Sequence, residues 1–219
     1  MTTPDAISRI AVLGSGQVGQ TLAEGFKRHG YEVRIATREP GKLAEFSKKT
    51  GIAETTFSEG AAWGQAIVLA VLGTAALEAL KLAGGKHLAG KPILDTTNPI
   101  AKEPPQDGVL KFFTTPNSSL MEELQAAFPA AELVKVFNSV GAALMVNPAI
   151  PSGRPTMFYC GNSATAKAFV ARVIEQFGWE GADMGTATAA RAIEPLCQLW
   201  CIPGFLHNDW MHAFRVVRP

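Results

Sequence analysis

Short apolar runs alternate with stretches of helical periodicity from the start of the chain. Residues 9–13 (RIAVL) form an apolar, β-branched run that predicts a buried strand. Further along, Val18, Leu22 and Phe26 recur at the spacing of one helix face. Apolar and polar residues then alternate over residues 31–38, which predicts a second strand. The opening therefore predicts a strand, a turn, a helix and a strand.

The alternation of strands and helices continues to the end of the chain. Further strands are predicted at residues 65–72, 91–97, 132–140 and 156–162. Further helices are predicted at residues 42–50, 75–85, from Ser119 onward, 163–178 and 186–202. This order indicates an α/β fold, specifically a Rossmann-type doubly wound parallel sheet, which binds its ligand beyond the carboxyl ends of the strands.

Three local signals refine these elements. Ser119 followed by Glu122 matches the capping-box pattern that opens a helix. Pro195 falls near the middle of the predicted helix at residues 186–202, so we expect a kink or a break there. Residues 100–117 are rich in proline and predict an irregular surface loop.

Composition and charge exclude several function classes. The 219 residues are 47% hydrophobic and 18% charged, which is typical of a globular protein with a sizeable core. The net charge is +1 without a basic run, so neither nucleic acid nor a membrane is expected as a partner. Residues 1–10 lack the pattern of a secretory leader, and no apolar run is long enough to span a bilayer. We therefore expect a cytoplasmic protein.

The three cysteines are Cys160, Cys197 and Cys201, and they form no Cys-x-x-Cys pair. Cys197 and Cys201 are four residues apart, as on one helix face, but no histidine or further cysteine shares that spacing. We expect buried packing roles and no metal site.

A glycine-rich turn joins the first strand to the first helix. Gly14 suits the tight turn, Gly16 lets a pyrophosphate approach the backbone, and Gly19 lets the helix pack closely on the sheet. Free N–H groups and the helix dipole favour phosphate at the helix start. In this strand–turn–helix context the turn predicts a dinucleotide site, and a plain turn without ligand is the alternative. The predicted contacts are Gly14, Ser15, Gly16, Gln17, Val18 and Gly19.

The end of the second strand indicates which dinucleotide binds. An NAD site usually carries an acidic residue there, whereas this strand ends in Thr37 and Arg38, with Lys42 close behind. A hydroxyl, a guanidinium and an ammonium suit a 2′-phosphate, so we expect NADP(H). Two alternatives remain open: Glu39 could reach the ribose in a shifted register, and Arg38 could be a solvated surface charge.

Four stretches resemble, in order, the NADP-dependent oxidoreductases of the coenzyme F420 (deazaflavin) type. They are VLGSGQVGQTLAEGFKRHGYEVRIATR at residues 12–38, LDTTNP at 94–99, SSLMEELQAAFPAAELVKVFNSVGAALMVNP at 118–148 and GTATAARAIEPLCQLW at 185–200. The same fold forms the reductase domain of the membrane ferric reductases. The resemblance covers nearly the whole chain.

The resemblance implies an NADP-binding Rossmann domain at residues 1–147 and a small C-terminal α/β lobe at residues 148–219. This lobe would close a cleft over the nicotinamide. The phosphate-binding set of the family falls on Thr37, Arg38 and Lys42. The residues around the nicotinamide fall on Ala70, Val71, Leu72, Asn98, Pro99, Phe137 and Asn138. We also expect a homodimer.

Two parts of the chain depart from the family pattern. The family commonly has proline after the fourth strand, where this chain has residues 72–74 (LGT). The C-terminal residues 204–219, which include His207, Trp210 and His212, match no known deazaflavin contact.

The expected activity is hydride transfer between NADP(H) and a deazaflavin (F420) or a flavin. Such a step depends on stacking and alignment, so we assign no catalytic residue. His207 and His212 are interpreted as surface or packing residues, and Trp200 and Trp210 as core residues or walls of the second-substrate pocket. Two alternatives stay open: a short hydroxyacid or imine reductase of the phosphogluconate-dehydrogenase type, and a non-catalytic NADP-binding sensor.

Overall fold

A single eight-stranded sheet organises the computed structural model, which describes residues 7–217. Most of the N-terminal stretch inspected for a leader therefore lies outside the described residues. The strands stand in the order β3-β2-β1-β4-β5-β6-β7-β8. They are β1 (Arg9–Leu13), β2 (Glu32–Ala36), β3 (Ala53–Thr55), β4 (Ala66–Leu69), β5 (Pro92–Asp95), β6 (Glu132–Lys135), β7 (Thr156–Gly161) and β8 (Glu180–Asp183).

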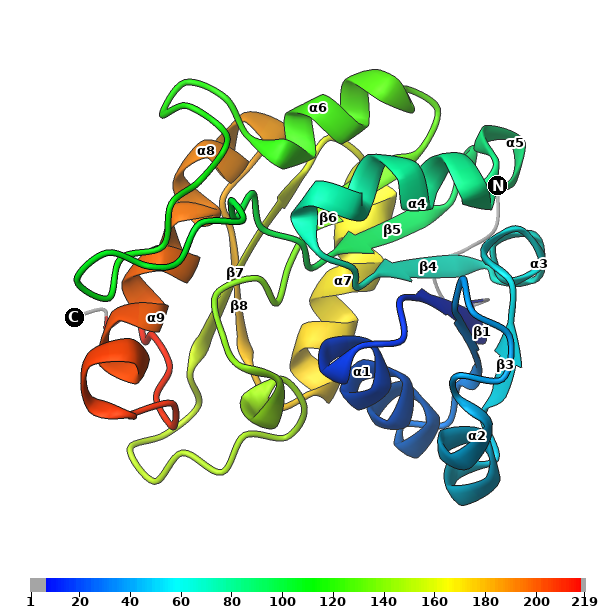
Figure 1. The fold of residues 1–219 in the computed structure, drawn as a ribbon, viewed down its shortest axis with the longest axis horizontal. Helices are drawn as coiled ribbons and strands as arrows, with labels where there is room; N and C mark the ends of the chain where they lie inside the picture. The colour runs from blue at the N-terminus through cyan, green and yellow to red at the C-terminus, as the bar shows by residue number, and fades with distance from the viewer. Residues whose placement is uncertain (1–6, 218–219) are drawn as a thin grey trace.

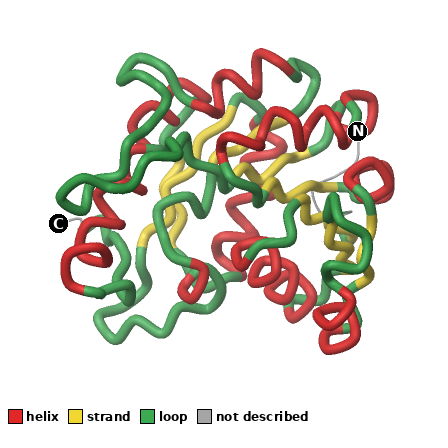
Figure 2. Tube along the Cα trace, in the orientation of Figure 1, coloured by secondary structure: helices red, strands yellow, loops and turns green. Residues whose placement is uncertain are grey.

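Helices cover both faces of this sheet (Figure 1). They are α1 (Gln17–Arg28), α2 (Ala44–Thr50), α3 (Phe57–Trp63), α4 (Ala76–Ala83), α5 (Gly85–Leu88), α6 (Leu120–Ala127), α7 (Ala164–Gln176), α8 (Ala190–Ile193) and α9 (Pro195–His207). In the part of the chain that the structure describes, none of them is long and apolar enough to cross a membrane. The loop at residues 100–117 runs without regular helix or strand, as predicted (Figure 2).

The sheet is parallel except at one pair of strands. β6 and β7 run antiparallel, with Lys135 opposite Cys160. The connection between them holds only a short 3₁₀ turn, Ala142–Leu144. Because no crossover helix carries the chain back across the sheet, β7 starts at the edge where β6 ends. The fold prediction is confirmed as a Rossmann-like α/β fold, with this antiparallel pair as the departure from an all-parallel sheet.

Alternation along the buried strands sends side chains into two apolar cores. On one face, Val12 of β1 packs with residues of α1 and α7, among them Phe26 and Phe169, and with Phe177 just after α7. On the other face, Leu13 and Leu69 pack with residues of α3, α4, α6 and α8. The period of two residues along a strand explains why neighbouring positions serve opposite faces.

Some elements differ from the prediction. The segment of β3 and α3 was not predicted, because β3 has only three residues and none of them is fully buried. α3 nevertheless carries a local start signal, a complete capping box between Thr56 and Glu59. β8 was also missed, since its sequence EGAD shows no apolar alternation. The predicted break at Pro195 is confirmed: α8 ends at Ile193 and α9 begins at the proline.

Residues 148–219 contribute β7 and β8 to the same sheet as the N-terminal strands. The separation into a domain at residues 1–147 and a lobe at residues 148–219 stays a prediction.

Candidate cofactor site

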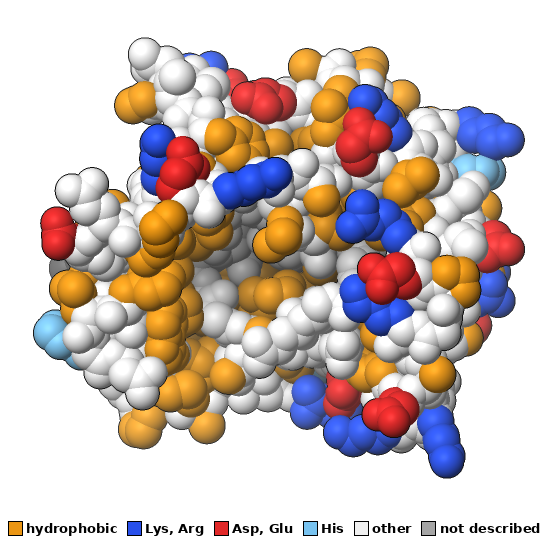
Figure 3. Space-filling view, in the orientation of Figure 1, with side chains coloured by type: hydrophobic (Ala, Val, Ile, Leu, Met, Phe, Trp, Pro, Cys, Tyr) orange, Lys and Arg blue, Asp and Glu red, His pale blue; other side chains and the backbone are white. Residues whose placement is uncertain are grey.

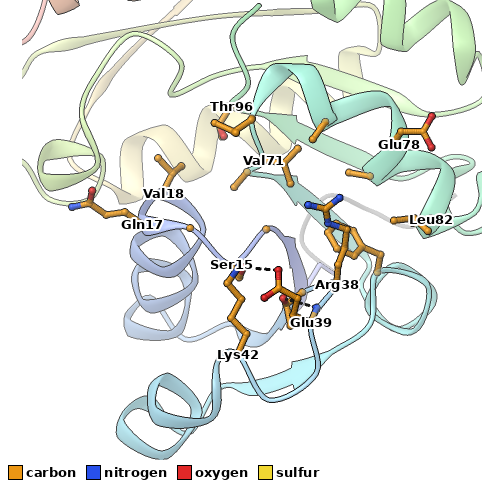
Figure 4. A pocket seen from close by; sticks show the side chains of 18 residues that line it. Ser15, Gln17, Val18, Arg38, Glu39, Lys42, Val71, Glu78, Leu82 and Thr96 are labelled. Carbon is orange, nitrogen blue, oxygen red and sulfur yellow. Dashed lines mark hydrogen bonds and ion pairs between the residues drawn. The ribbon is translucent and has the colours of Figure 1, made fainter. Parts of the chain in front are cut away.

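A pocket opens beyond the carboxyl ends of β1, β2 and β4, with a volume of about 450 Å³. β2 and β4 flank β1 on opposite sides, so the connections diverge here as at the ligand-binding switch point of a doubly wound sheet. Figure 4 shows the side chains that surround it. The lining residues are Gly14, Ser15, Gly16, Gln17, Val18, Thr37, Arg38, Glu39, Lys42, Phe57, Ala70, Val71, Leu72, Ala75, Glu78, Ala79, Leu82 and Thr96.

The three glycines of the turn have different surroundings. Gly14 has a φ of +133°, and a Cβ there would lie 2.1 Å from the carbonyl oxygen of Ala70. A Cβ on Gly19 would lie 2.1 Å from the carbonyl oxygen of Gly14, so α1 packs directly on the turn. A Cβ on Gly16 would meet nothing within 4 Å. Gly14 and Gly19 thus allow close packing, and Gly16 leaves open space facing the pocket beside the start of α1.

The polar side of the pocket comes from the segment after β2. Thr37 is buried, and its Oγ1 accepts a hydrogen bond of 3.2 Å from the backbone N–H of Glu39. Glu39 Oε1 lies 3.4 Å from Lys42 Nζ, and both side chains are exposed. Arg38 reaches the pocket from the same turn (Figure 4), and no carboxylate among residues 7–217 pairs with it. The structure therefore brings the hydroxyl of Thr37 and the cations of Arg38 and Lys42 together. The carboxylate of Glu39 neutralises part of their positive charge.

Six lining residues were not predicted from the sequence: Phe57, Ala75, Glu78, Ala79, Leu82 and Thr96. Phe57 belongs to α3, the helix that sequence reasoning missed. Ala75, Ala79 and Leu82 are spaced four and three residues apart, so they share one face of the predicted helix at residues 75–85. That spacing, on the helix that follows β4, was the signal that could have found them.

Five predicted residues do not line this pocket. Gly19 packs against the turn and Phe137 is fully buried in the core, while the other three lie at the next strand ends along the sheet. Asn98 and Pro99 follow β5, and Asn138 follows β6. The Asn98 side-chain amide donates to the backbone oxygen of Asn138 at 2.8 Å, and the Asn138 amide donates to Asn98 Oδ1 at 3.0 Å. Asn138 also donates to the carbonyl oxygen of Ile193 at 3.0 Å. These contacts join the two strand ends to the end of α8.

A buried ionic cluster lies beneath these asparagines. Lys135 Nζ is 2.7 Å from Asp95 Oδ2 and 3.0 Å from Glu194 Oε1. Burial alone would lower the pKa of Lys135, but the two carboxylates outweigh it and raise that pKa. Sequence reasoning missed this cluster because its members come from three distant segments.

One face of the molecule has a hollow with apolar side chains along its wall, here called the apolar hollow. Figure 3 shows it in the middle of this face, with hydrophobic side chains crowded along the wall on the α9 side. Leu110, Cys197, Trp200 and Cys201 form a buried cluster at α9, with Ile100, Phe112, Trp210 and Phe214 packed against it.

The cysteines and His212 occupy packing positions. All three cysteines are buried and unpaired, and burial raises the pKa of Cys160 to about 12. His212 stacks on Trp200, with ring centroids 5.1 Å apart, and its Nε2 lies 3.0 Å from the Trp200 carbonyl oxygen. His207 is the exposed last residue of α9. The described residues contain no group of three or more histidine, cysteine or acidic side chains that could hold a metal ion.

Comparison with known proteins identifies the family. The model of the family described as NADP oxidoreductase, coenzyme F420-dependent, matches residues 9–99. A solved structure from Arthrobacter sp. FB24 carries the provisional name of an F420-dependent NADP-reductase. Its sequence is 32% identical to this chain, and the TM-score between the two structures is 0.90. The match covers 97% of this chain and 100% of that one. This chain belongs to the coenzyme F420-dependent NADP oxidoreductase family. The family is the one that the resemblance indicated.

Curated relatives include longer proteins. Metalloreductase STEAP3 of Rattus norvegicus is 31% identical over 209 residues, which cover 93% of this chain and 40% of that protein. The chain thus spans about two fifths of that relative's length. A Plasmodium falciparum pyrroline carboxylate reductase, solved with NADP bound, is 17% identical with a TM-score of 0.56, over 87% of this chain and 64% of that one. This last likeness concerns the fold alone.

Proposed function

We propose that the protein transfers a hydride between NADP(H) and a flat redox ring, a deazaflavin (F420) or a flavin. The observation that carries the proposal is the pocket in which the glycine turn meets Thr37, Arg38 and Lys42. Membership of the family supports NADP(H) as the cofactor, and the family description supports the deazaflavin.

The pocket fits the cofactor in shape and charge. The open space at Gly16 accepts a pyrophosphate at the positive end of the α1 dipole. Arg38 and Lys42 supply charge-assisted hydrogen bonds for a 2′-phosphate. Ala75, Ala79 and Leu82 of the α4 side offer an apolar surface for the adenine ring.

The nicotinamide end is expected beyond Val71 and Thr96, toward the asparagine pair and the apolar hollow. When bound, NADPH supplies the hydride from its nicotinamide ring. The protein's own residues would align the two rings and exclude water, and the apolar cluster at Trp200 suits that purpose. No protein nucleophile or proton shuttle is required.

The deciding experiment is a titration with NADPH and NADH followed by a screen of acceptors. The acceptors are a soluble deazaflavin, FMN, FAD, a ferric chelate and a cyclic imine. Faster oxidation of NADPH by the deazaflavin or a flavin than by the other acceptors supports the proposal. Preferred reduction of the imine contradicts it and favours the imine-reductase alternative. NADPH binding without reduction of any acceptor favours the sensor.

The ferric chelate is included in the screen because the chain is similar to a metalloreductase. Direct reduction of the chelate, without a flavin, would contradict a flat ring as the acceptor.

A further inference from the structure

Three charged side chains are fully enclosed between the sheet and the helices α6, α8 and α9. Lys135 and Asp95 are 0% exposed, and Glu194 is 1% exposed. Asp95 ends β5, Lys135 ends β6, and Glu194 lies in the junction between α8 and α9. The cluster thus joins three segments that are distant in the sequence.

Each of the three charged side chains contacts at least one partner. Lys135 Nζ contacts both carboxylates and donates to the carbonyl oxygen of Thr97 at 2.7 Å. Asp95 Oδ1 accepts from the backbone N–H and the hydroxyl of Thr97, at 2.9 and 2.6 Å. Glu194 accepts from the backbone N–H groups of Leu120 and Met121, each at 3.0 Å. The start of α6 therefore offsets the cluster's second negative charge.

Stability alone does not account for such a cluster. Replacing a buried ion pair by well-packed apolar side chains is often neutral or stabilising, because burial costs each ion its hydration. What the ions add is a fixed geometry, since the Lys135 ammonium contacts both carboxylates and donates to the carbonyl oxygen of Thr97 at the same time. The α8–α9 junction is therefore held at one position against the sheet.

That position bears on the acceptor side of the site. Ile193, the neighbour of Glu194, accepts the hydrogen bond from Asn138, which in turn pairs with Asn98. One turn and two turns beyond Glu194, α9 presents Cys197 and Cys201 to the apolar cluster. Moving the junction would shift both the asparagine pair and the α9 wall.

We propose that Glu194, Lys135 and Asp95 are positioning residues for hydride transfer, because they hold the α9 wall and the Asn98–Asn138 pair in register with the carboxyl ends of β5 and β6. This inference rests on the proposed function, since it concerns the wall against which the acceptor ring would lie. The cofactor pocket is largely independent of the cluster: none of its lining residues comes from β6, α8 or α9.

The test compares Glu194→Gln and Glu194→Asp with the unaltered protein. Gln keeps the size of the side chain but turns one acceptor into a donor that faces backbone N–H groups. Asp keeps the charge but shortens its reach. Both variants should bind NADPH as the unaltered protein does. Their kcat for reduction of the deazaflavin or FMN should fall about tenfold or more, because a misplacement of about 1 Å can cost this much.

Glu122→Gln is the matched control. Glu122 of α6 binds Arg191 of α8 at 2.7 Å, so it links α6 to α8 at the surface. Glu194 links α6 to the end of α8 in the interior. This variant should keep the unaltered kcat while losing some thermal stability. A second readout is the ¹⁹F resonance of 5-fluorotryptophan at Trp200, assigned with Trp200→Phe. It should shift in both Glu194 variants and stay in place in the control.

Folded Glu194 variants with unchanged kcat and an unchanged Trp200 resonance would overturn the inference. An equal loss of kcat in Glu122→Gln would also overturn it, because general loosening of the helices would then suffice. If Glu194→Gln does not fold, Glu194→Asp decides by the same criteria. An unaltered protein that reduces no acceptor refutes the proposed function instead, and the Trp200 resonance then decides whether the cluster positions α9.

Discussion

Asn98 and Asn138 each donate a side-chain amide hydrogen to the other residue, across the carboxyl ends of β5 and β6. Asn138 is buried and gives its second amide hydrogen to Ile193. We predict that Asn138→Ala lowers the free energy of unfolding by about 1–3 kcal/mol, because it leaves buried acceptors unpaired. Denaturant titration measures the change. Asn117→Ala, on an exposed loop, should have almost no effect, and equal losses in the two variants would contradict the assignment.

Cofactor choice should depend on Arg38. We predict tighter binding of NADPH than of NADH, and expect Arg38→Ala to remove most of the difference. One charge-assisted phosphate contact is worth about 1.5–3 kcal/mol, or roughly ten- to hundredfold in Kd. Isothermal titration with both cofactors measures it. Glu39→Gln should leave NADPH binding intact or tighten it, since it removes a carboxylate beside the pocket. Equal dissociation constants for the two cofactors in the unaltered protein would refute the NADP assignment.

The glycine turn separates cofactor binding from packing. Gly16 has a φ of −76° and open space around it, so Gly16→Val should fold normally and abolish NADPH binding. Gly19→Ala places its Cβ against the carbonyl oxygen of Gly14 and should lower the Tm instead. Calorimetry with NADPH beside a thermal melt distinguishes the two effects. Unchanged NADPH binding in Gly16→Val would mean that the turn is structural only.

The surface bridge between Glu122 and Arg191 predicts a pH dependence. The hydrogen bond from Arg191 holds the pKa of Glu122 below its usual 4.5, so the ionised carboxylate is favoured in the folded state. The resulting stability is present above pH 4.5 and is lost as the pH falls through the lower, folded-state pKa. Glu122→Gln should therefore be less stable than the unaltered protein near neutral pH, by about 0.2–1 kcal/mol for a surface pair. Thermal melts across this range should converge at acid pH, and a constant gap would contradict the prediction.

The histidines near α9 should be dispensable for chemistry. His212 is stacked on Trp200, and His207 is exposed at the helix end. We expect the double variant His207→Gln, His212→Gln to lower kcat by less than the ~10²–10⁴-fold that removal of a general acid causes. Stopped-flow oxidation of NADPH by FMN provides the rate. A larger loss with NADPH binding intact would show that protonation is part of the reaction.

Local sequence signals were enough to predict much of the fold and of the phosphate side of the pocket. The strands that position the glycine turn, Arg38 and Lys42 lie close to them in sequence. The order of these strands in the sheet therefore already places the three together at one pocket. Ser119 opens α6 as predicted, and its hydroxyl oxygen accepts a hydrogen bond from the backbone N–H of Glu122. In a full capping box the Glu122 carboxylate would accept from the backbone N–H of Ser119. Here the carboxylate accepts from the Ser119 hydroxyl instead.

Other features depend on tertiary pairing that no local pattern encodes. β3 and β8 are short and polar, and they become strands only because a neighbouring strand is available for pairing. Lys135 follows the apolar residues of β6, and its burial depends on Asp95 and Glu194 from other segments. The homodimer and the cytoplasmic location stay predictions.

The packing of α7 limits how the chain can be divided. Phe177, just after α7, contacts Phe26 of α1 at 4.9 Å and Phe137 at 5.7 Å between ring centroids, beneath the strands that carry the cofactor pocket. A fragment of residues 1–147 would contain every residue that lines the pocket, but the aromatic partners supplied by the later chain would be missing. Grafting NADP binding into another protein would therefore require transfer of α7 and Phe177 together with the glycine turn.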